Sequence, residues 1–189
     1  MAADRNIPLH KAGQLAVVVV GFFSAVLLLL LQAVRGTASG GRLGVMWLMA
    51  LGLAVRYWWV ILLLEWPFRI ARVVLLLLAW SVVAAAAAMT DLDRAWVLLL
   101  AALGGIGAAT EFYNLRTQQW RVGSEALSRT LRRDHVVGGI TALAASGALV
   151  GLGIWLPTPL TGWVMCLVVA DWVRLMAMVA SHRRLLHAG

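Results

Sequence analysis

Charged residues are scarce in this chain of 189 residues: they make up 13% of it, whereas an ordinary soluble domain has about 25%. Hydrophobic residues fill 62% of the chain, more than the roughly 45–50% of such a domain. One small core cannot bury all of these hydrophobic residues, because a soluble domain of this size exposes a large surface to water. The composition therefore excludes an ordinary soluble enzyme and a disordered tail. It predicts a protein that lives in a lipid bilayer.

Residues that often carry chemistry are also few. Cys166 is the only cysteine, which excludes an intrachain disulfide, a CxxC redox pair and a zinc–thiolate cluster. Lys11, the only lysine, precedes the first apolar run, so no lysine inside a span can form a Schiff base. All four histidines are predicted on the cytoplasmic side of the apolar runs (His10, His135, His182, His187). Ser146 therefore lacks the base that a serine nucleophile needs, and facing spans offer no axial histidines for a haem.

Long apolar runs are what the sequence has in abundance. A helix that crosses a hydrocarbon core of about 30 Å needs about 20 apolar residues. Runs of this kind cover residues 13–34, 43–64, 73–89, 95–113, 135–156 and 161–180. We expect an all-α polytopic membrane bundle of six transmembrane helices, arranged as three hairpins in a single domain. The alternative is five spans plus one re-entrant segment, the second run, because Arg35 and Arg42 would otherwise occupy an outer loop.

Arginine sets the orientation that we expect. The net charge is +8, with sixteen basic residues against eight acidic ones, and basic residues of membrane proteins gather in cytoplasmic loops. With six spans and cytoplasmic termini, only Arg35, Arg42 and Arg94 fall in outer loops. The inner flanks hold Arg5, Lys11, Arg69, Arg72, Arg116, Arg121, Arg129, Arg132, Arg133, Arg183 and Arg184. We therefore predict cytoplasmic termini. The bias toward Arg over Lys, with the Ala, Leu, Val and Gly content, favours a bacterial inner membrane.

The second helix of each predicted hairpin carries a charged residue followed by an aromatic one: Arg56-Tyr57, Glu111-Phe112 and Asp171-Trp172. Small residues share a helix face with two of these charges. The two faces are Gly44, Leu48, Gly52 and Arg56 on the second helix, and Gly104, Gly107, Ala108 and Glu111 on the fourth. Because small residues mark the places where helices approach closely in lipid, we expect these charges to face the protein interior.

The fifth predicted helix carries two adjacent rows of small residues. These rows are Gly138/Ala142/Ser146 and Gly147/Gly151. We expect this helix to be the most crowded one, with Ser146 acting as a packing residue. Gly151 is predicted to lie at a helix contact, so that a larger side chain there would destabilise the bundle.

Ionisable residues inside spans cost about 2.5–3.5 kcal/mol each on insertion scales, so they need partners or a water-filled cavity. The candidates are Arg56, Glu111, Asp171 and Arg174. One interpretation is a polar path in which Glu111 or Asp171 takes up a proton or an ion opposite Arg56. The other is structural: Asp171 and Arg174 neutralise each other at i,i+3, Glu111 reaches water or Arg116, and Arg56 snorkels or pairs with an acid.

Residues 114–134 form the one long polar stretch, which we predict to be a basic, amphipathic cytoplasmic loop. Trp120, Leu127 and Leu131 fall on one side of a helical wheel, and the basic side chains Arg121, Arg129, Arg132 and Arg133 stay polar. Such a segment suits the headgroup layer of anionic lipids. The alternative is a docking surface for a cytoplasmic partner.

Two functions fit these features. The first is a small transport protein, or the membrane subunit of a transport complex, with Arg56, Glu111 and Asp171 along a buried polar path. The second is a non-catalytic scaffold subunit of a larger cell-envelope complex. We expect no enzyme activity, no cofactor, no metal and no nucleic-acid partner. Anionic lipid and either further copies of the chain or other membrane subunits are the expected partners. A transporter should hold a polar cavity at Glu111 or Asp171, and a scaffold should be packed shut there.

Overall fold

The structure is a computed structural model that describes residues 9–36, 39–63, 70–90, 93–117, 125–155 and 160–187. These residues form an all-helical bundle, as the apolar runs predict. Its helices are α1 (Leu9–Arg35), α2 (Gly40–Leu63), α3 (Ile70–Ala88), α4 (Asp93–Thr117), α5 (Glu125–Trp155) and α6 (Leu160–His187).

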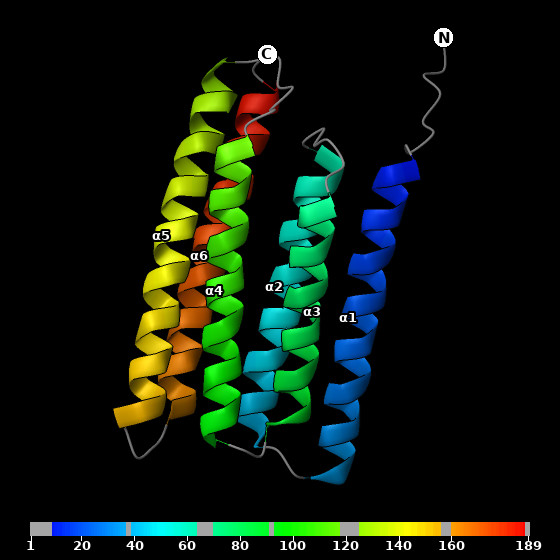
Figure 1. The fold of residues 1–189 in the computed structure, drawn as a ribbon, viewed down its shortest axis with the longest axis vertical. Helices are drawn as coiled ribbons and strands as arrows, with labels where there is room; N and C mark the ends of the chain where they lie inside the picture. The colour runs from blue at the N-terminus through cyan, green and yellow to red at the C-terminus, as the bar shows by residue number, and fades with distance from the viewer. Residues whose placement is uncertain are drawn as a thin grey trace.

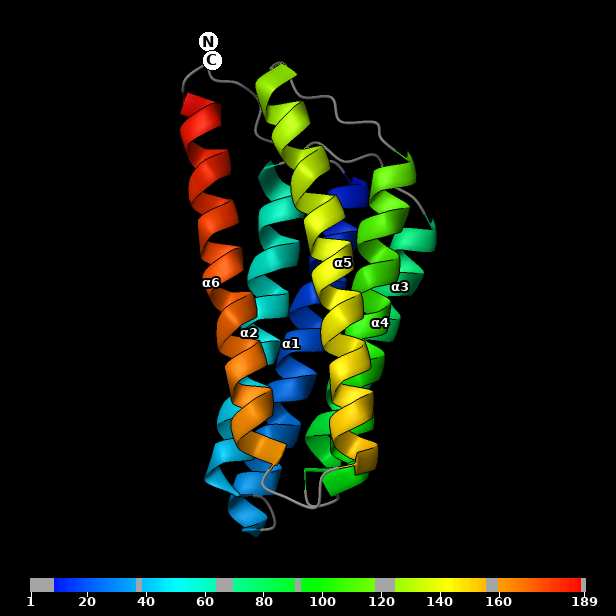
Figure 2. The same cartoon turned by 90° about the vertical axis from the view of Figure 1, so that its left-hand side faces the viewer.

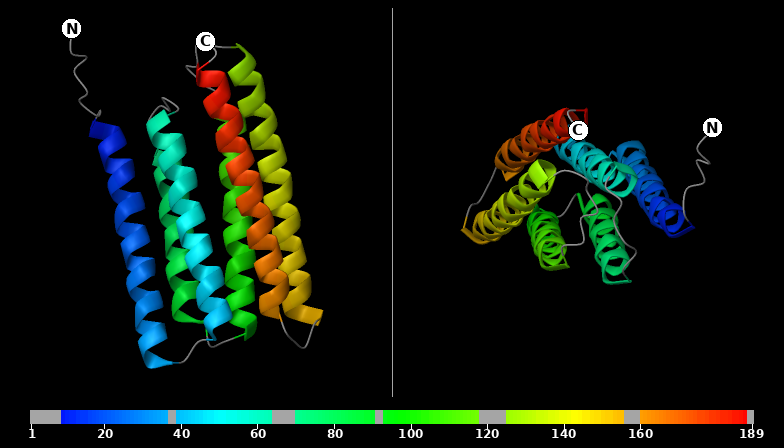
Figure 3. Two further views of the ribbon diagram at one scale, coloured as in Figure 1. Left: turned by 180° about the vertical axis from the view of Figure 1, so that it is seen from behind. Right: turned by 90° about the horizontal axis from the view of Figure 1, so that it is seen from above.

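The helices run alternately up and down, and Leu9 and His187 lie at the same end of the bundle (Figures 1 and 2). Seen from above, they form two rows of three, with α6, α2 and α1 in one row and α5, α4 and α3 in the other (Figure 3). Contacts between neighbouring helices close this arrangement into a ring, since α1 packs on α3 at one side and α5 packs on α6 at the other.

Within the described residues, five helices are long and apolar enough to span a membrane: α1, α3, α4, α5 and α6. The helix α2 has 24 residues, which corresponds to about 36 Å at 1.5 Å per residue. It is one continuous helix that reaches from one end of the bundle to the other (Figure 2). It therefore does not turn back on itself as a re-entrant segment would. Large apolar side chains such as Phe23, Ile140 and Val173 are exposed on the outside of the bundle, as lipid contact requires.

The prediction of a loop over residues 114–134 is wrong for the part that the structure describes. Helix α4 continues to Thr117 and α5 already begins at Glu125. The reason is visible in the packing: Leu127 and Leu131 are buried, so the first turns of α5 dock on the bundle along its axis and do not lie flat in a headgroup layer. Arg129, Arg132 and Arg133 are exposed on these turns, whereas Trp120 and Arg121 lie outside the described residues.

The two faces of small residues pack as predicted. A Cβ added at Gly52 of α2 would lie 3.2 Å from Nε1 of Trp172 in α6, and that indole N–H donates to the Leu48 carbonyl at 2.9 Å. A Cβ added at Gly104 of α4 would lie 3.2 Å from the Ala142 carbonyl of α5. These close approaches turn the α2 face toward α6 and the α4 face toward α5.

Only one of the two small-residue rows of α5 is crowded. Gly138 and Ala142 face α4 and α6, and the Ser146 hydroxyl donates to the Ala101 carbonyl at 2.7 Å, which confirms its packing role. The prediction for Gly151 is wrong, because a Cβ added at Gly147 or Gly151 would meet nothing within 4 Å. That row faces away from the neighbouring helices.

The two ends of the bundle differ in arginine content. The end where α1 begins, called the Arg-rich end below, carries Arg72, Arg116, Arg129, Arg132, Arg133, Arg183 and Arg184. Arg35, Arg42 and Arg94 lie at the opposite end. There Arg42 donates to the Thr90 carbonyl at 2.7 Å and lies 5.6 Å from the Trp96 ring centroid. It thus binds the C-terminal end of α3, a favourable place for a cation, which accounts for an arginine in a predicted outer loop.

Candidate functional site

A cavity of about 330 Å³ lies between α2, α4, α5 and α6. Its lining extends from Leu131 to Leu149 on α5 and from Val164 to His182 on α6. At 1.5 Å per residue, each of these stretches is about 27 Å long, so the cavity follows the bundle axis over most of a bilayer's hydrocarbon thickness. It is long and narrow.

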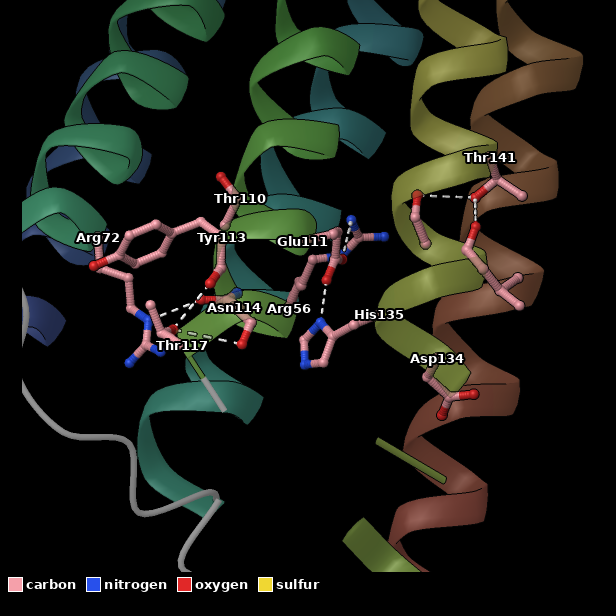
Figure 4. Close-up of polar contacts among 12 residues, drawn as sticks. Arg56, Arg72, Thr110, Glu111, Tyr113, Asn114, Thr117, Asp134, His135 and Thr141 are labelled. Carbon is pink, nitrogen blue, oxygen red and sulfur yellow. Dashed lines mark hydrogen bonds and ion pairs between the residues drawn. The ribbon is translucent and has the colours of Figure 1, made fainter. Parts of the chain in front are cut away.

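An ionic network from three of these helices lies inside the cavity. Nη2 of Arg56 in α2 donates to both carboxylate oxygens of Asp171 in α6, at 3.0 and 3.2 Å. Nη1 of the same arginine lies 3.7 Å from Oε1 of Glu111 in α4. Arg174 lies one turn along α6, and its Nη2 is 3.3 Å from Oδ1 of Asp171. Figure 4 shows Glu111 between Arg56 and a histidine of α5.

That histidine is His135, whose Nδ1 contacts Oε2 of Glu111. The pair is buried, and Gly138, one turn further along α5, makes room for it. A Cβ at Gly138 would lie 3.1 Å from Oε1 of Glu111 and 2.9 Å from Nη1 of Arg174. Glycine at this position therefore lets the charged side chains of α4 and α6 meet against the backbone of α5.

The members of the network differ in exposure. The side chains of Glu111 and Arg56 are 12% and 20% exposed, whereas that of Asp171 is 53% exposed. Asp171 is nevertheless bonded to Arg56 of the neighbouring helix and lines the cavity. Asp171 is therefore the most exposed member of the network, and it lies at the cavity lining.

A second histidine–carboxylate pair lines the cavity nearer the Arg-rich end. Nε2 of His182 lies 2.9 Å from Oδ2 of Asp134, and the Trp59 indole N–H donates to Nδ1 of His182 at 3.3 Å. Because an indole only donates, Nδ1 must accept, and the ring proton of the neutral imidazole belongs on Nε2, facing Asp134. At the surface, Nε of Arg133 lies 3.6 Å from Oδ1 of Asp134.

The cavity has a polar half and an apolar half. The charged and imidazole groups all lie between the level of Arg56 and Asp171 and the Arg-rich end. Beyond that level, toward the opposite end, the lining is largely aliphatic and includes Met49, Leu100, Leu103, Leu149 and Val164. A solute that reaches Asp171 from the Arg-rich end would therefore meet a largely apolar stretch of the cavity.

The structure brings the predicted residues Arg56, Glu111, Asp171 and Arg174 together in one network. The structural interpretation is correct for the pairing of Asp171 with Arg174 and of Arg56 with an acid on a neighbouring helix. The polar path stays a prediction. The expected contact of Glu111 with water or Arg116 is replaced by His135 and Arg56.

His135 and His182 lie toward the Arg-rich end, as the sequence predicts, but they also line the cavity, and the sequence-based prediction of the site did not include them. Helix α5 starts ten residues earlier than predicted, so His135 lies well inside it. The i+4 row Leu127, Leu131, His135 carries the signal that finds this histidine, because all three are buried. The pairing of Asp134 with His182 joins residues 48 positions apart, and local patterns hold no signal for it.

Among the described residues, no three His, Cys, Asp or Glu side chains gather in a way that could hold a metal ion. The fold and the cavity define an all-helical protein, compatible with a membrane, that has an internal ionic site. Comparison with known protein families, characterised proteins and solved structures gives no match. The function is therefore argued from this site.

Proposed function

We propose that the chain is a small membrane transport protein, or the membrane subunit of a transport complex, whose path follows the cavity between α2, α4, α5 and α6. The observation that carries this proposal is Asp171: its carboxylate faces Arg56 inside the bundle and is still 53% exposed. Charged side chains that face a water-filled cavity within a bundle typically belong to a substrate or ion path.

The shape of the cavity supports the same function. Its polar half offers hydrogen-bonding and charged groups to a hydrated solute, and its aliphatic half resists hydration. Hydrophobic constrictions close pores by dewetting. We infer that the cavity is accessible from the Arg-rich end as far as Leu53, one turn beyond Arg56, and is closed further toward the opposite end. Transport then requires α2 and α6 to shift relative to α4 and α5, and the salt bridges of Arg56 across these helices are the contacts that would change.

We further propose that the protein lies in a bacterial inner membrane with both termini in the cytoplasm, on the argument that basic residues favour this side. The Arg-rich end would then face the cytoplasm. The exposed side chains of Arg129, Arg132 and Arg133 suit anionic headgroups, each contributing about 1 kcal/mol near such a surface. Further copies of the chain or other membrane subunits are the partners we expect along the lipid-facing sides.

Thiol labelling tests whether the cavity is an aqueous path. In a Cys166→Ala background, we compare Leu53→Cys, whose side chain lines the cavity, with Leu76→Cys, which is buried in α3 and outside the cavity lining. A charged, membrane-impermeant methanethiosulfonate applied to inside-out vesicles should label Leu53→Cys and leave Leu76→Cys unmodified. Ser128→Cys, in the first turns of α5, should react in the same vesicles and stay unlabelled in intact cells.

If neither Leu53→Cys nor Leu76→Cys reacts with the reagent while Ser128→Cys does, the cavity is closed to water. The alternative, a scaffold subunit whose charges only pair with each other, would then be favoured. The network fits this alternative because its two arginines and two carboxylates neutralise each other. Labelling of Ser128→Cys in intact cells would overturn the proposed orientation. The aqueous path would then still be tested by comparing Leu53→Cys with Leu76→Cys.

A further inference from the structure

We infer that the ion moved through this cavity, alone or together with another solute, is the proton, and that the Glu111–His135 pair binds it. This inference rests on the proposed transport function and names its ion. Nδ1 of His135 and Oε2 of Glu111 face each other directly, which is the geometry of two groups that share one proton. Histidine is the side chain whose unperturbed titration falls between pH 5 and 8.

The groups around the pair favour a proton over a metal cation. Arg56 and Tyr57 face it from α2, Asp171, Arg174 and His182 from α6, and Asp134 precedes His135 on α5. On α4, Asn114 one turn along accepts from Arg72 of α3. Two guanidinium groups repel Na⁺ or K⁺, and the site offers no cage of oxygens for such an ion. A proton needs only one acceptor lone pair.

The charges of the network balance before a proton binds. With His135 neutral, the positive charges of Arg56 and Arg174 equal the negative charges of Glu111 and Asp171. One proton bound by the Glu111–His135 pair then adds one positive charge to the cavity. The step breaks an O–H bond of hydronium at the Arg-rich end, which leaves a water molecule, and forms an O–H or N–H bond on the pair. Release to water reverses it.

The pair is also connected to the rest of the network. Glu111 interacts with both His135 and Arg56, at 3.7 Å from the latter. Protonation of Glu111 removes its charge and leaves Arg56 attracted to Asp171 of α6 alone. Proton binding thereby weakens the link between α2 and α4 relative to the link between α2 and α6. In the second pair, that of His182 and Asp134, Trp59 fixes the tautomer of His182.

Proton flux into proteoliposomes tests the inference. Purified protein is reconstituted with the pH dye pyranine inside, and a K⁺ gradient with valinomycin sets an inside-negative potential. The wild type should acidify the interior faster than protein-free liposomes. Glu111→Gln and His135→Gln should fall to the protein-free rate, whereas Glu111→Asp should retain flux. Glu125→Gln is the matched control, since it neutralises an exposed acid outside the cavity, and it should behave like the wild type.

Wild-type rates in both Glu111→Gln and His135→Gln would overturn the proton site. If the wild type shows no proton flux while the Leu53→Cys thiol is accessible, the proton is not the transported ion, but the transport function stands. An inaccessible Leu53→Cys thiol together with no flux would overturn both. If Glu111→Gln does not fold, the comparison of His135→Gln with Glu125→Gln decides the inference alone.

Discussion

Replacing Arg56 with leucine is expected to lower the free energy of unfolding by about 3 kcal/mol, the lower end of the range for breaking a buried ion pair by removing one partner. Arg56 joins Asp171 of α6 to Glu111 of α4. Without it, the carboxylates of Glu111 and Asp171 share only Arg174 and His135, and the Glu111 side chain is buried. The loss stays at the lower end because Asp171 keeps Arg174 and is partly exposed.

Arg129→Leu is the matched control for this variant. Arg129 pairs with Glu125 at 3.6 Å, but both side chains are mostly exposed, and exposed pairs of this kind contribute about 0.3–0.5 kcal/mol. Thermal unfolding in detergent, followed by circular dichroism at 222 nm, should separate the two variants clearly. Equal midpoints of thermal unfolding for Arg56→Leu and Arg129→Leu would mean that the salt bridges of Arg56 contribute no more to stability than an exposed pair.

The second large effect is expected at Gly21 in α1. A Cβ added there would lie 2.4 Å from Cγ of Trp80 in α3, a distance that real Cβ atoms do not show. Trp80 is itself buried and has little room to move, so Gly21→Ala forces α1 and α3 apart. We expect the free energy of unfolding to fall by about 1–3 kcal/mol, which is the usual cost of overpacking a dense contact.

Gly147→Ala makes the same chemical change where nothing lies within 4 Å of the new methyl group. Replacing a glycine inside a helix with alanine is worth about 0.8–1.0 kcal/mol in favour of alanine, so this variant should unfold at or above the wild-type temperature. The same detergent unfolding experiment measures both. If Gly21→Ala were as stable as Gly147→Ala, the packing of α1 on α3 would be incorrect.

Much of the fold follows from the sequence, because in a bilayer each helix must satisfy its own backbone hydrogen bonds. Apolar runs therefore locate helices, and the small-residue face that ends at Arg56 correctly predicts contact with another helix. What fails is the choice between two neighbouring small-residue rows, as Gly151 shows. Both rows permit close approach, and only the positions of the other helices decide which one is used.

The candidate site is predictable only in part. Charges within apolar runs identify Arg56, Glu111 and Asp171, because isolated charges in lipid are costly. His135 is missed because the three residues before it, 132–134, are charged, which makes the start of α5 resemble a loop. Its burial depends on Leu127 and Leu131 docking on the bundle. The cavity itself is a property of how four helices pack, and no single helix encodes it.

The central claim, that charged solutes pass through this cavity, is tested most directly by recording transient currents from proteoliposomes on a solid-supported membrane. Rapid jumps in pH, Na⁺, K⁺ or Cl⁻ are applied to the wild type and to Asp171→Asn. The variant should fold, because Asp171 is half exposed and Arg56 keeps Glu111. We predict a current in the wild type for at least the pH jump and its loss in Asp171→Asn. A wild type silent in every jump, or a variant with undiminished current, would contradict the account.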